Sequence, residues 1–291
     1  MATLKDILNK IGAVKKTQQI TRAMNMVAAA RLRSTQGKVE AFDPYAAKFA
    51  EVLENLASRI EPDIHPLLMQ KENVTRVELL HFSADRGLCG SFNTQLISRG
   101  EKWLEEQREQ GKEPSMTLVG RKGRDYFKKR DVTITDSHIQ VYGSIDMAFV
   151  NQITRQLTDR FVNNEIDEVY MIYTRFISMA RQEITKLKLL PVEYEQKEEQ
   201  DASTAEYLCE PSAEELMIDL LPKYVSVQVY NAFLQSEVSE HAARMAAMDN
   251  ATKNCKDMIQ DLTLVYNKAR QAAITAELMD IVGGAEAIRT A

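Results

Sequence analysis

Glycine and proline are scarce in this chain, and neither occurs between Lys223 and Val282. Because these residues most often end or kink a helix, the stretch is predicted to form one long helix. No apolar run approaches the ~20 residues needed to cross a bilayer, which argues against an integral membrane protein. The N-terminus lacks the apolar core and small-residue cleavage site of a secretory signal, so none is expected.

Motifs for catalysis and metal binding are also missing. The four histidines are dispersed, with no HxxxH or HExxH spacing, and neither GxSxG nor GxxxxGK[ST] occurs. Cys89, Cys209 and Cys255 lack CxxC spacing, so free thiols in a reducing compartment are expected. We therefore predict no catalytic residue, no metal site and no cofactor. A net charge of −5 argues against a nucleic-acid partner.

The long C-terminal helix carries an apolar seam with the period of a left-handed coiled coil. Its members alternate three and four residues apart: Met248, Ala251, Cys255, Met258, Leu262, Val265, Ala269, Ala272, Ala276 and Met279. A seam of this kind needs a partner helix.

A second helix is predicted from Leu4 to about Arg59, and its own seam starts with Leu4, Ile7, Ile11 and Val14. A strict heptad would next place Gln18, Thr21 and Asn25 on the seam, whereas Ile20, Met24 and Val27 carry the apolar character. We expect the apolar stripe to drift around the helix here. Residues 1–40 are basic and residues 212–291 are acidic, which favours pairing of the two ends.

The periodicity changes between the two helical ends, where short apolar runs alternate with amphipathic ones. Strands are predicted at 75–83, 116–119, 132–139, 168–177 and 183–192, with helices at 92–110, 121–130 and 145–164. This alternation predicts a Rossmann-like α/β domain with a mostly parallel five-stranded sheet, its last two strands forming an edge hairpin. The expected parts are a helix at 1–60, the α/β domain at 74–192, an acidic linker at 193–211 and a helix at 212–291. The two helices together are expected to form one discontinuous stalk.

The run Asp85 to Gly90 follows the first predicted strand, where doubly wound sheets bind phosphates. It lacks GxGxxG spacing, and Gly87 and Gly90 serve equally well to turn a strand tightly into a helix. An α/β nucleotide-binding enzyme with a helical dimerisation stalk is therefore kept as the alternative function.

Three separated segments, in order, resemble the γ subunit family of F-type ATP synthases. Residues 264–287, including Ile274-Thr275-Ala276-Glu277-Leu278-Met279, resemble the C-terminal helix of that family, and residues 11–30 resemble its N-terminal helix. Residues 83–90 (SADRGLCG) resemble its glycine turn. No chloroplast-type insert or CxxC pair is present, which favours the bacterial form.

This resemblance implies a non-catalytic rotor shaft that couples proton flow to ATP synthesis on the β subunits. The terminal helices would form an antiparallel coiled coil inside a ring of three α and three β subunits. The α/β domain would form the foot against the ε subunit and the membrane c-ring, at the cytoplasmic face of the cell membrane and without spanning it. The resemblance also implies partner contacts for Met24, Arg270, Gln271 and Thr275, and places Ile288 in an apolar sleeve of the ring.

Overall fold

The computed structural model describes residues 3–57, 64–193 and 212–290. The chain divides into two compact units: Met1–Ala28 with Met245–Ala291, here called the helix pair, and Ala29–Arg244, here called the sheet unit. Helix α1 (Leu4–Ala57) and helix α5 (Ala213–Thr290) each contribute to both. This division differs from the expected one, because 29–57 and 213–244 belong to the sheet unit rather than to a separate stalk. Most of the expected acidic linker, residues 194–211, lies outside the described residues.

The sheet unit is built on five strands in the order β3-β2-β1-β4-β5. Their bounds are Arg76–Phe82 (β1), Glu113–Val119 (β2), Thr133–His138 (β3), Glu168–Phe176 (β4) and Gln182–Leu190 (β5). The first four are parallel, and β5 runs antiparallel to β4 at the edge. This confirms the predicted mostly parallel sheet with an edge hairpin. Strand β2 begins three residues before the predicted start, because Glu113, Pro114 and Ser115 interrupt the apolar pattern.

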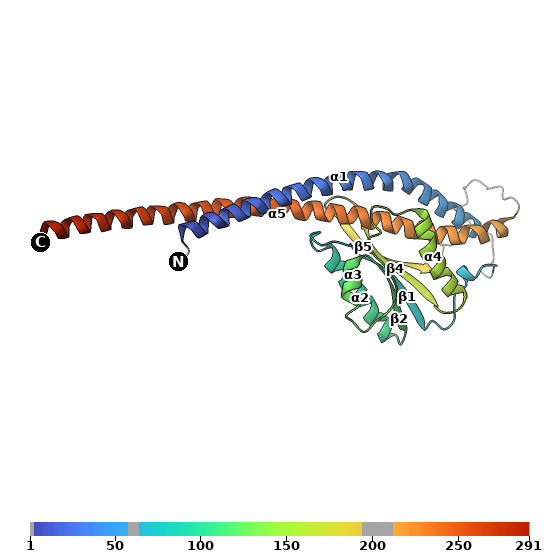
Figure 1. Ribbon diagram of the computed structural model, residues 1–291. Helices are drawn as coiled ribbons and strands as arrows, with labels where there is room; N and C mark the ends of the chain where they lie inside the picture. The colour runs from blue at the N-terminus through green and yellow to red at the C-terminus, as the bar shows by residue number, and fades with distance from the viewer. Residues whose placement is uncertain (1–2, 58–63, 194–211, 291) are drawn as a thin grey trace, which may run out of the picture. The chain divides into compact units, whose positions relative to one another are not determined.

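Helices cover both faces of this sheet (Figure 1). Helices α2 (Phe92–Glu109) and α3 (Arg121–Phe127) share a core with β1 and β2 that includes Leu79, Trp103 and Phe127. Helix α4 (Met147–Val162) shares a second core with the sheet-unit parts of α1 and α5, together with the short 3-10 helix η2 (Pro66–Leu68). In that core the rings of Phe82 and Phe233 lie 4.8 Å apart, edge to face.

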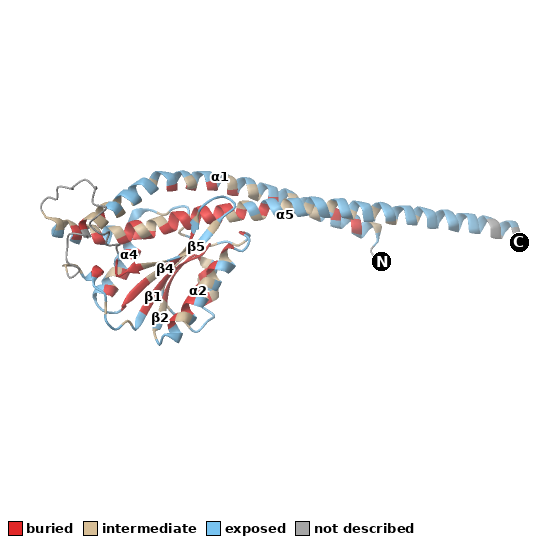
Figure 2. Cartoon of the chain, turned by 180° about the vertical axis from the view of Figure 1, so that it is seen from behind, coloured by how far each residue is buried: buried red, intermediate tan, exposed pale blue. Residues whose placement is uncertain are grey.

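The part of α5 that lies in the sheet unit is largely buried (Figure 2). Helix α5 begins at Ala213, close to the expected start at residue 212, and runs through Pro222. A proline inside a helix costs about 3 kcal/mol. Met217, Leu221 and Val225 are fully buried around it, and each contributes about 1.5–3 kcal/mol by leaving water, so burial outweighs the loss.

Candidate functional site: the helix pair and the carboxyl edge of the sheet

The seam of α1 keeps a strict heptad through the helix pair. Thr21 is buried, whereas Ile20 and Val27 are 60% and 55% exposed. The predicted drift of the apolar stripe is therefore wrong. Polar residues remain in the seam because they find partners across it: the Thr21 and Thr252 hydroxyls lie 2.8 Å apart, and the Asn25 amide donates to the Met245 carbonyl at 2.9 Å.

The seam of α5 also differs from the predicted register. Met248, Cys255, Leu262 and Ala269 are buried or half-buried, as expected, and the predicted Ala251 is half-buried. Between these residues, the observed seam has four further half-buried members: Thr252, Ile259, Tyr266 and Ala273. Three predicted members, Met258, Val265 and Ala272, lie one residue earlier and are exposed, Met258 at 47% and Val265 at 51%. Thr252 explains this register, because its hydroxyl is bonded to the Thr21 hydroxyl across the seam and can donate to the Met248 carbonyl of its own helix.

On the α1 side, Ile7 and Ile11 are buried and Leu4 and Val14 are half-buried. Since Thr21 pairs with Thr252 in an antiparallel arrangement, Leu4 comes opposite the region of Ala269. Every residue from Ile274 to Ala285 is exposed, including the predicted seam members Ala276 and Met279. This stretch has no α1 residue opposite it within the described chain.

The residues expected to contact partner subunits lie mainly on open helix surface. Arg270, Gln271 and Thr275 are exposed, Ile288 is 82% exposed, and Met24 is half-buried. The Thr275 hydroxyl donates to the Gln271 carbonyl at 2.9 Å within α5. The structure thus brings Gln271 and Thr275 together on one helix turn and leaves both available to a partner.

A second group of polar residues lies at the carboxyl edge of the sheet, where β1 and β2 end. The Asp85 carboxylate accepts hydrogen bonds from the backbone N–H groups of Arg121 at 3.0 Å and Gln140 at 2.9 Å. The Ser83 hydroxyl donates to the Val119 carbonyl and accepts from the Gly123 N–H, each at 2.9 Å. These bonds tie the loops after three neighbouring strands together.

Gly120 is what allows these loops to approach one another. Its φ is +92°, and a Cβ added there would lie 1.9 Å from the Ser83 carbonyl oxygen. Any side chain would therefore push the ends of β1 and β2 apart.

The bonds of Asp85 bear on the alternative function. In doubly wound sheets, backbone N–H groups at the strand ends hold the phosphates of a nucleotide. Here an internal carboxylate already accepts from the N–H groups of Arg121 and Gln140. This geometry argues against a nucleotide-binding enzyme of the doubly wound type.

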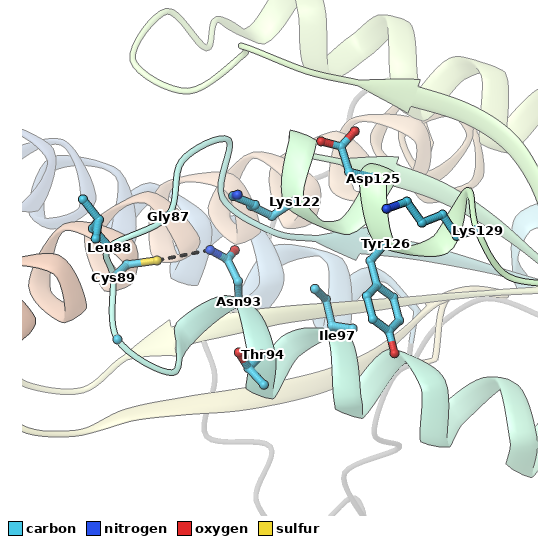
Figure 3. A pocket seen from close by; sticks show the side chains of 11 residues that line it. Gly87, Leu88, Cys89, Asn93, Thr94, Ile97, Lys122, Asp125, Tyr126 and Lys129 are labelled. Atoms are coloured by element: carbon cyan, nitrogen blue, oxygen red, sulfur yellow. Dashed lines mark hydrogen bonds between the residues drawn. The ribbon is translucent and has the colours of Figure 1, made fainter.

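The predicted glycine turn lies beside a pocket of about 410 Å³ between α2 and α3 (Figure 3). Gly90 has a φ of +60° and meets a backbone requirement, whereas a Cβ on Gly87 would make only an ordinary contact with Lys122. Cys89 is buried in this turn, and the Asn93 amide donates to its sulfur at 3.2 Å. Burial raises the pKa of the Cys89 thiol, which makes it a poor nucleophile. Cys255 is also a free thiol, and Cys209 lies outside the described residues.

A larger cavity of about 610 Å³, here called the edge cavity, opens at the same carboxyl edge within the sheet unit. Its lining comes from α1, the β1 and β3 loops, the start of α3 and α5: Arg31, Ser34, Thr35, Lys38, Asp85, Arg86, Arg121, Gln140, Tyr142, Gly143, Glu237, Glu240, His241 and Arg244. Sequence analysis did not single out this group, because residues from five segments form no local spacing pattern. Single members did stand out in the sequence: Asp85 and Arg86 belong to the glycine-turn motif, and Arg121 is one of two basic residues after the second predicted strand.

The α5 wall of the edge cavity contains a buried ion pair between Glu240 and Arg244. The Arg244 guanidinium bonds the Glu240 carboxylate at 2.6 Å and donates to the Gly87 carbonyl at 3.3 Å. Burial raises the pKa of Glu240, and the neighbouring Arg244 opposes this shift. The α5 wall is thereby fixed to the glycine turn.

Among the described residues, no group of three or more His, Cys, Asp or Glu side chains is placed to hold a metal ion. Within the same residues, no helix is both long and apolar enough to span a membrane.

Comparison with known proteins gives one consistent result. The family model described as ATP synthase matches residues 3–288. The ATP synthase gamma chain of Syntrophobacter fumaroxidans is 51% identical over 291 residues, covering 99% of this chain and all of that protein. The gamma chain of Syntrophus aciditrophicus is 49% identical, with 99% of each chain covered.

Solved structures agree at the level of the fold. A chain of the Euglena gracilis mitochondrial ATP synthase, in an assembly described as OSCP/F1/c-ring, superimposes with a TM-score of 0.70 at 20% identity. The match covers 99% of this chain and 95% of the other. With full-length relatives near 50% identity and a family model spanning almost every residue, the chain belongs to the ATP synthase gamma chain family.

Proposed function

We propose that this chain is the central rotor shaft of an F1Fo ATP synthase, coupling proton flow through the membrane sector to ATP synthesis or hydrolysis on the β subunits. It is a non-catalytic subunit, peripheral to the cytoplasmic face of a bacterial cell membrane. Membership of the gamma chain family supports this proposal. The observation that carries it physically is the unpartnered stretch of α5.

That stretch exposes an unusual amount of apolar surface. Leu278, Met279, Ile281 and Val282 are 57–67% exposed, and they follow one another along a helix with no intramolecular partner among the described residues. Contiguous apolar surface of this kind marks a protein–protein contact. A ring of three α and three β subunits around α5 would cover it.

Partners on the sheet unit are proposed by family membership. The ε subunit and the membrane c-ring would bind this unit, while the α and β subunits would surround the helix pair. Neither contact needs a ligand or a metal on this chain, and we propose no cofactor for it.

The shaft would work through asymmetry of contact. A rotor that presents a different face to each β subunit favours a different state of each nucleotide site, since a partner shifts an equilibrium only by its differential affinity for the two states. Equal contact in all orientations would transmit nothing. Arg270, Gln271 and Thr275 lie exposed where such contacts would form.

The decisive experiment is deletion of the residues after Leu262, followed by reconstitution with the other subunits in membrane vesicles. ATP-driven proton pumping should fall to background, because the truncated shaft loses the exposed apolar stretch. The full-length chain, purified with the same partners, is the control. Pumping that survives the deletion unchanged, or an isolated chain that turns over ATP at ordinary enzymatic rates, would contradict the rotor assignment and favour the alternative enzyme.

A further inference from the structure

The edge cavity is large enough for a small-molecule ligand. Its volume of about 610 Å³ falls within the range of roughly 300–1,000 Å³ typical of ligand sites. Its walls belong entirely to the sheet unit.

Three residues that line this cavity each carry a buried polar atom with no hydrogen-bond partner among the described residues. These atoms are the Arg121 Nε, the Tyr142 hydroxyl and the His241 Nδ1. They come from the start of α3, the loop before α4 and the middle of α5, and the His241 side chain is only 6% exposed. Buried polar groups in proteins are nearly always paired, with protein or with water, so these three atoms have hydrogen-bonding capacity left for a molecule that enters the cavity. All three can donate a hydrogen bond, which makes an acceptor the fitting ligand.

The basic side chains of the cavity favour an anion. Arg31, Lys38, Arg86 and Arg121 line it, and none of the ion pairs found among the described residues involves them. Unpaired arginines at a concave site are suited to bidentate binding of phosphate.

Three carboxylates also line the cavity, and most of their charge is already compensated. Asp85 accepts from two backbone N–H groups, and Glu240 is bonded to Arg244. Glu237 lies 3.7 Å from the Nε2 of His241. Five Arg and Lys side chains against three carboxylates leave a positive balance.

We propose that the edge cavity binds a phosphate-group anion. Arg31, Lys38 and Arg121 would supply the positive charge, while Tyr142 and His241 would donate the hydrogen bonds that their buried atoms now lack. The anion could be free inorganic phosphate or the phosphates of a nucleotide. Because the N–H groups of the strand-end loops are taken by Asp85, recognition would depend on side chains alone. This site is separate from the rotor proposal and does not rest on it.

Histidine NMR of the full chain tests the site directly, because the chain has only four histidines. Inorganic phosphate and ATP would each be titrated into 15N-labelled protein at constant ionic strength. Saturable shifts confined to the His241 ring, assigned with the variant His241→Gln, are expected. His65, His81 and His138 do not line the cavity and should stay unchanged. Competition between the two ligands would show that the phosphate group itself is recognised, and binding of ATP alone would identify the nucleotide as the source; either result supports the site.

A matched pair of double variants separates specific binding from general charge. Arg31→Gln with Arg121→Gln removes two cavity cations and should weaken binding at least tenfold. Arg33→Gln with Lys128→Gln removes the same charge from neighbouring exposed positions outside the cavity and should leave the affinity unchanged. Thermal unfolding of each variant would confirm that the fold is intact.

Two results would overturn the proposal. One is the absence of any saturable His241 shift with either ligand at millimolar concentration. The other is equal weakening by the two double variants, which would mean that the anion responds only to net charge.

Discussion

The hydroxyl groups of Thr21 and Thr252 lie 2.8 Å apart in the seam of the helix pair, in positions that a coiled coil usually gives to apolar residues. One hydroxyl donates to the other across the seam, and the accepting one donates in turn to a carbonyl of its own helix, Thr21 to Gln18 or Thr252 to Met248. A polar pair of this kind costs stability unless both members stay satisfied, so it fixes which residues of α1 and α5 face each other.

Replacing one member of this pair should weaken the helix pair more than replacing both. Thr21→Val leaves the Thr252 hydroxyl without its partner and should cost about 1 kcal/mol, whereas Thr21→Val with Thr252→Val should recover most of that loss. Native-state hydrogen exchange of α1 amides measures the effect. Thr17→Val is the control, because the Thr17 hydroxyl is exposed and bonds only the Ala13 carbonyl of its own helix. Strictly additive effects of the two substitutions would contradict the coupling.

The buried ion pair between Glu78 and Arg160 should be sensitive to removal of one partner. Glu78 is fully buried in β1, and its carboxylate accepts from Arg160 at 2.5 Å and from the Thr117 hydroxyl at 2.6 Å. Arg160→Met would leave a carboxylate in the sheet interior and should cost about 3 kcal/mol in chemical unfolding. Arg155→Met, on the same helix but 83% exposed, should change stability by less than about 0.5 kcal/mol. If Glu78→Met combined with Arg160→Met is no more stable than Arg160→Met alone, the explanation fails.

Alanine substitutions at Gly120 and Gly111 should destabilise the fold to different extents, because only at Gly120 would the added Cβ clash with the backbone of a neighbouring segment, at Ser83. Both have positive φ, but an added Cβ meets nothing within 4 Å at Gly111 and lies 1.9 Å from the Ser83 carbonyl oxygen at Gly120. Gly111→Ala should therefore cost about 1–2 kcal/mol, the price of the conformation alone. Gly120→Ala should cost at least twice as much or prevent folding. Thermal unfolding measures both, and equal melting temperatures for the two variants would exclude the clash.

Asp167 should link the stability of the sheet unit to acid pH. Burial opposes ionisation of its carboxyl group, but hydrogen bonds from the Arg76 and Thr75 N–H groups and from the Arg76 and Lys71 side chains lower its pKa to about 2. A folded pKa below the unfolded value means that the stabilisation is complete above about pH 4 and is lost as the pH falls toward 2.

Asp167→Asn should accordingly cost about 2 kcal/mol at pH 7 and much less near pH 2, measured by chemical unfolding at both pH values. Asp159→Asn is the control, because its carboxylate is 64% exposed. A loss of the same size at both pH values would show that Asp167 acts by packing rather than by charge.

The sheet was predictable from sequence because each strand carries its own local signal. Apolar and β-branched runs such as those of β1 and β4 alternate with amphipathic helices, and short loops restrict the order of the strands. The register of the helix pair was not predictable in the same way. Apolar residues such as Ile20 and Met258 drew the predicted seams away from the observed positions, which are held by polar contacts between the helices, Thr21 with Thr252 and Asn25 with Met245.

Cavity residues were hidden from sequence reasoning for a different reason. Arg31, Arg121 and His241 are separated by many tens of residues, and each resembles an ordinary charged or polar position on its own helix. The same holds for Glu78 and Arg160, which are 82 positions apart. A local sequence pattern predicts a single helix or strand, whereas these residues become neighbours only when the fold brings their helices and strands together.

The bonds that Asp85 makes to the N–H groups of Arg121 and Gln140 determine what the surrounding loops need in order to keep their shape. In a cofactor-dependent fold, the loops at the open end of the sheet depend on a bound molecule for their final shape. Here a side chain of the chain itself holds those loops together. The shape of this open end is therefore set by the chain's own sequence.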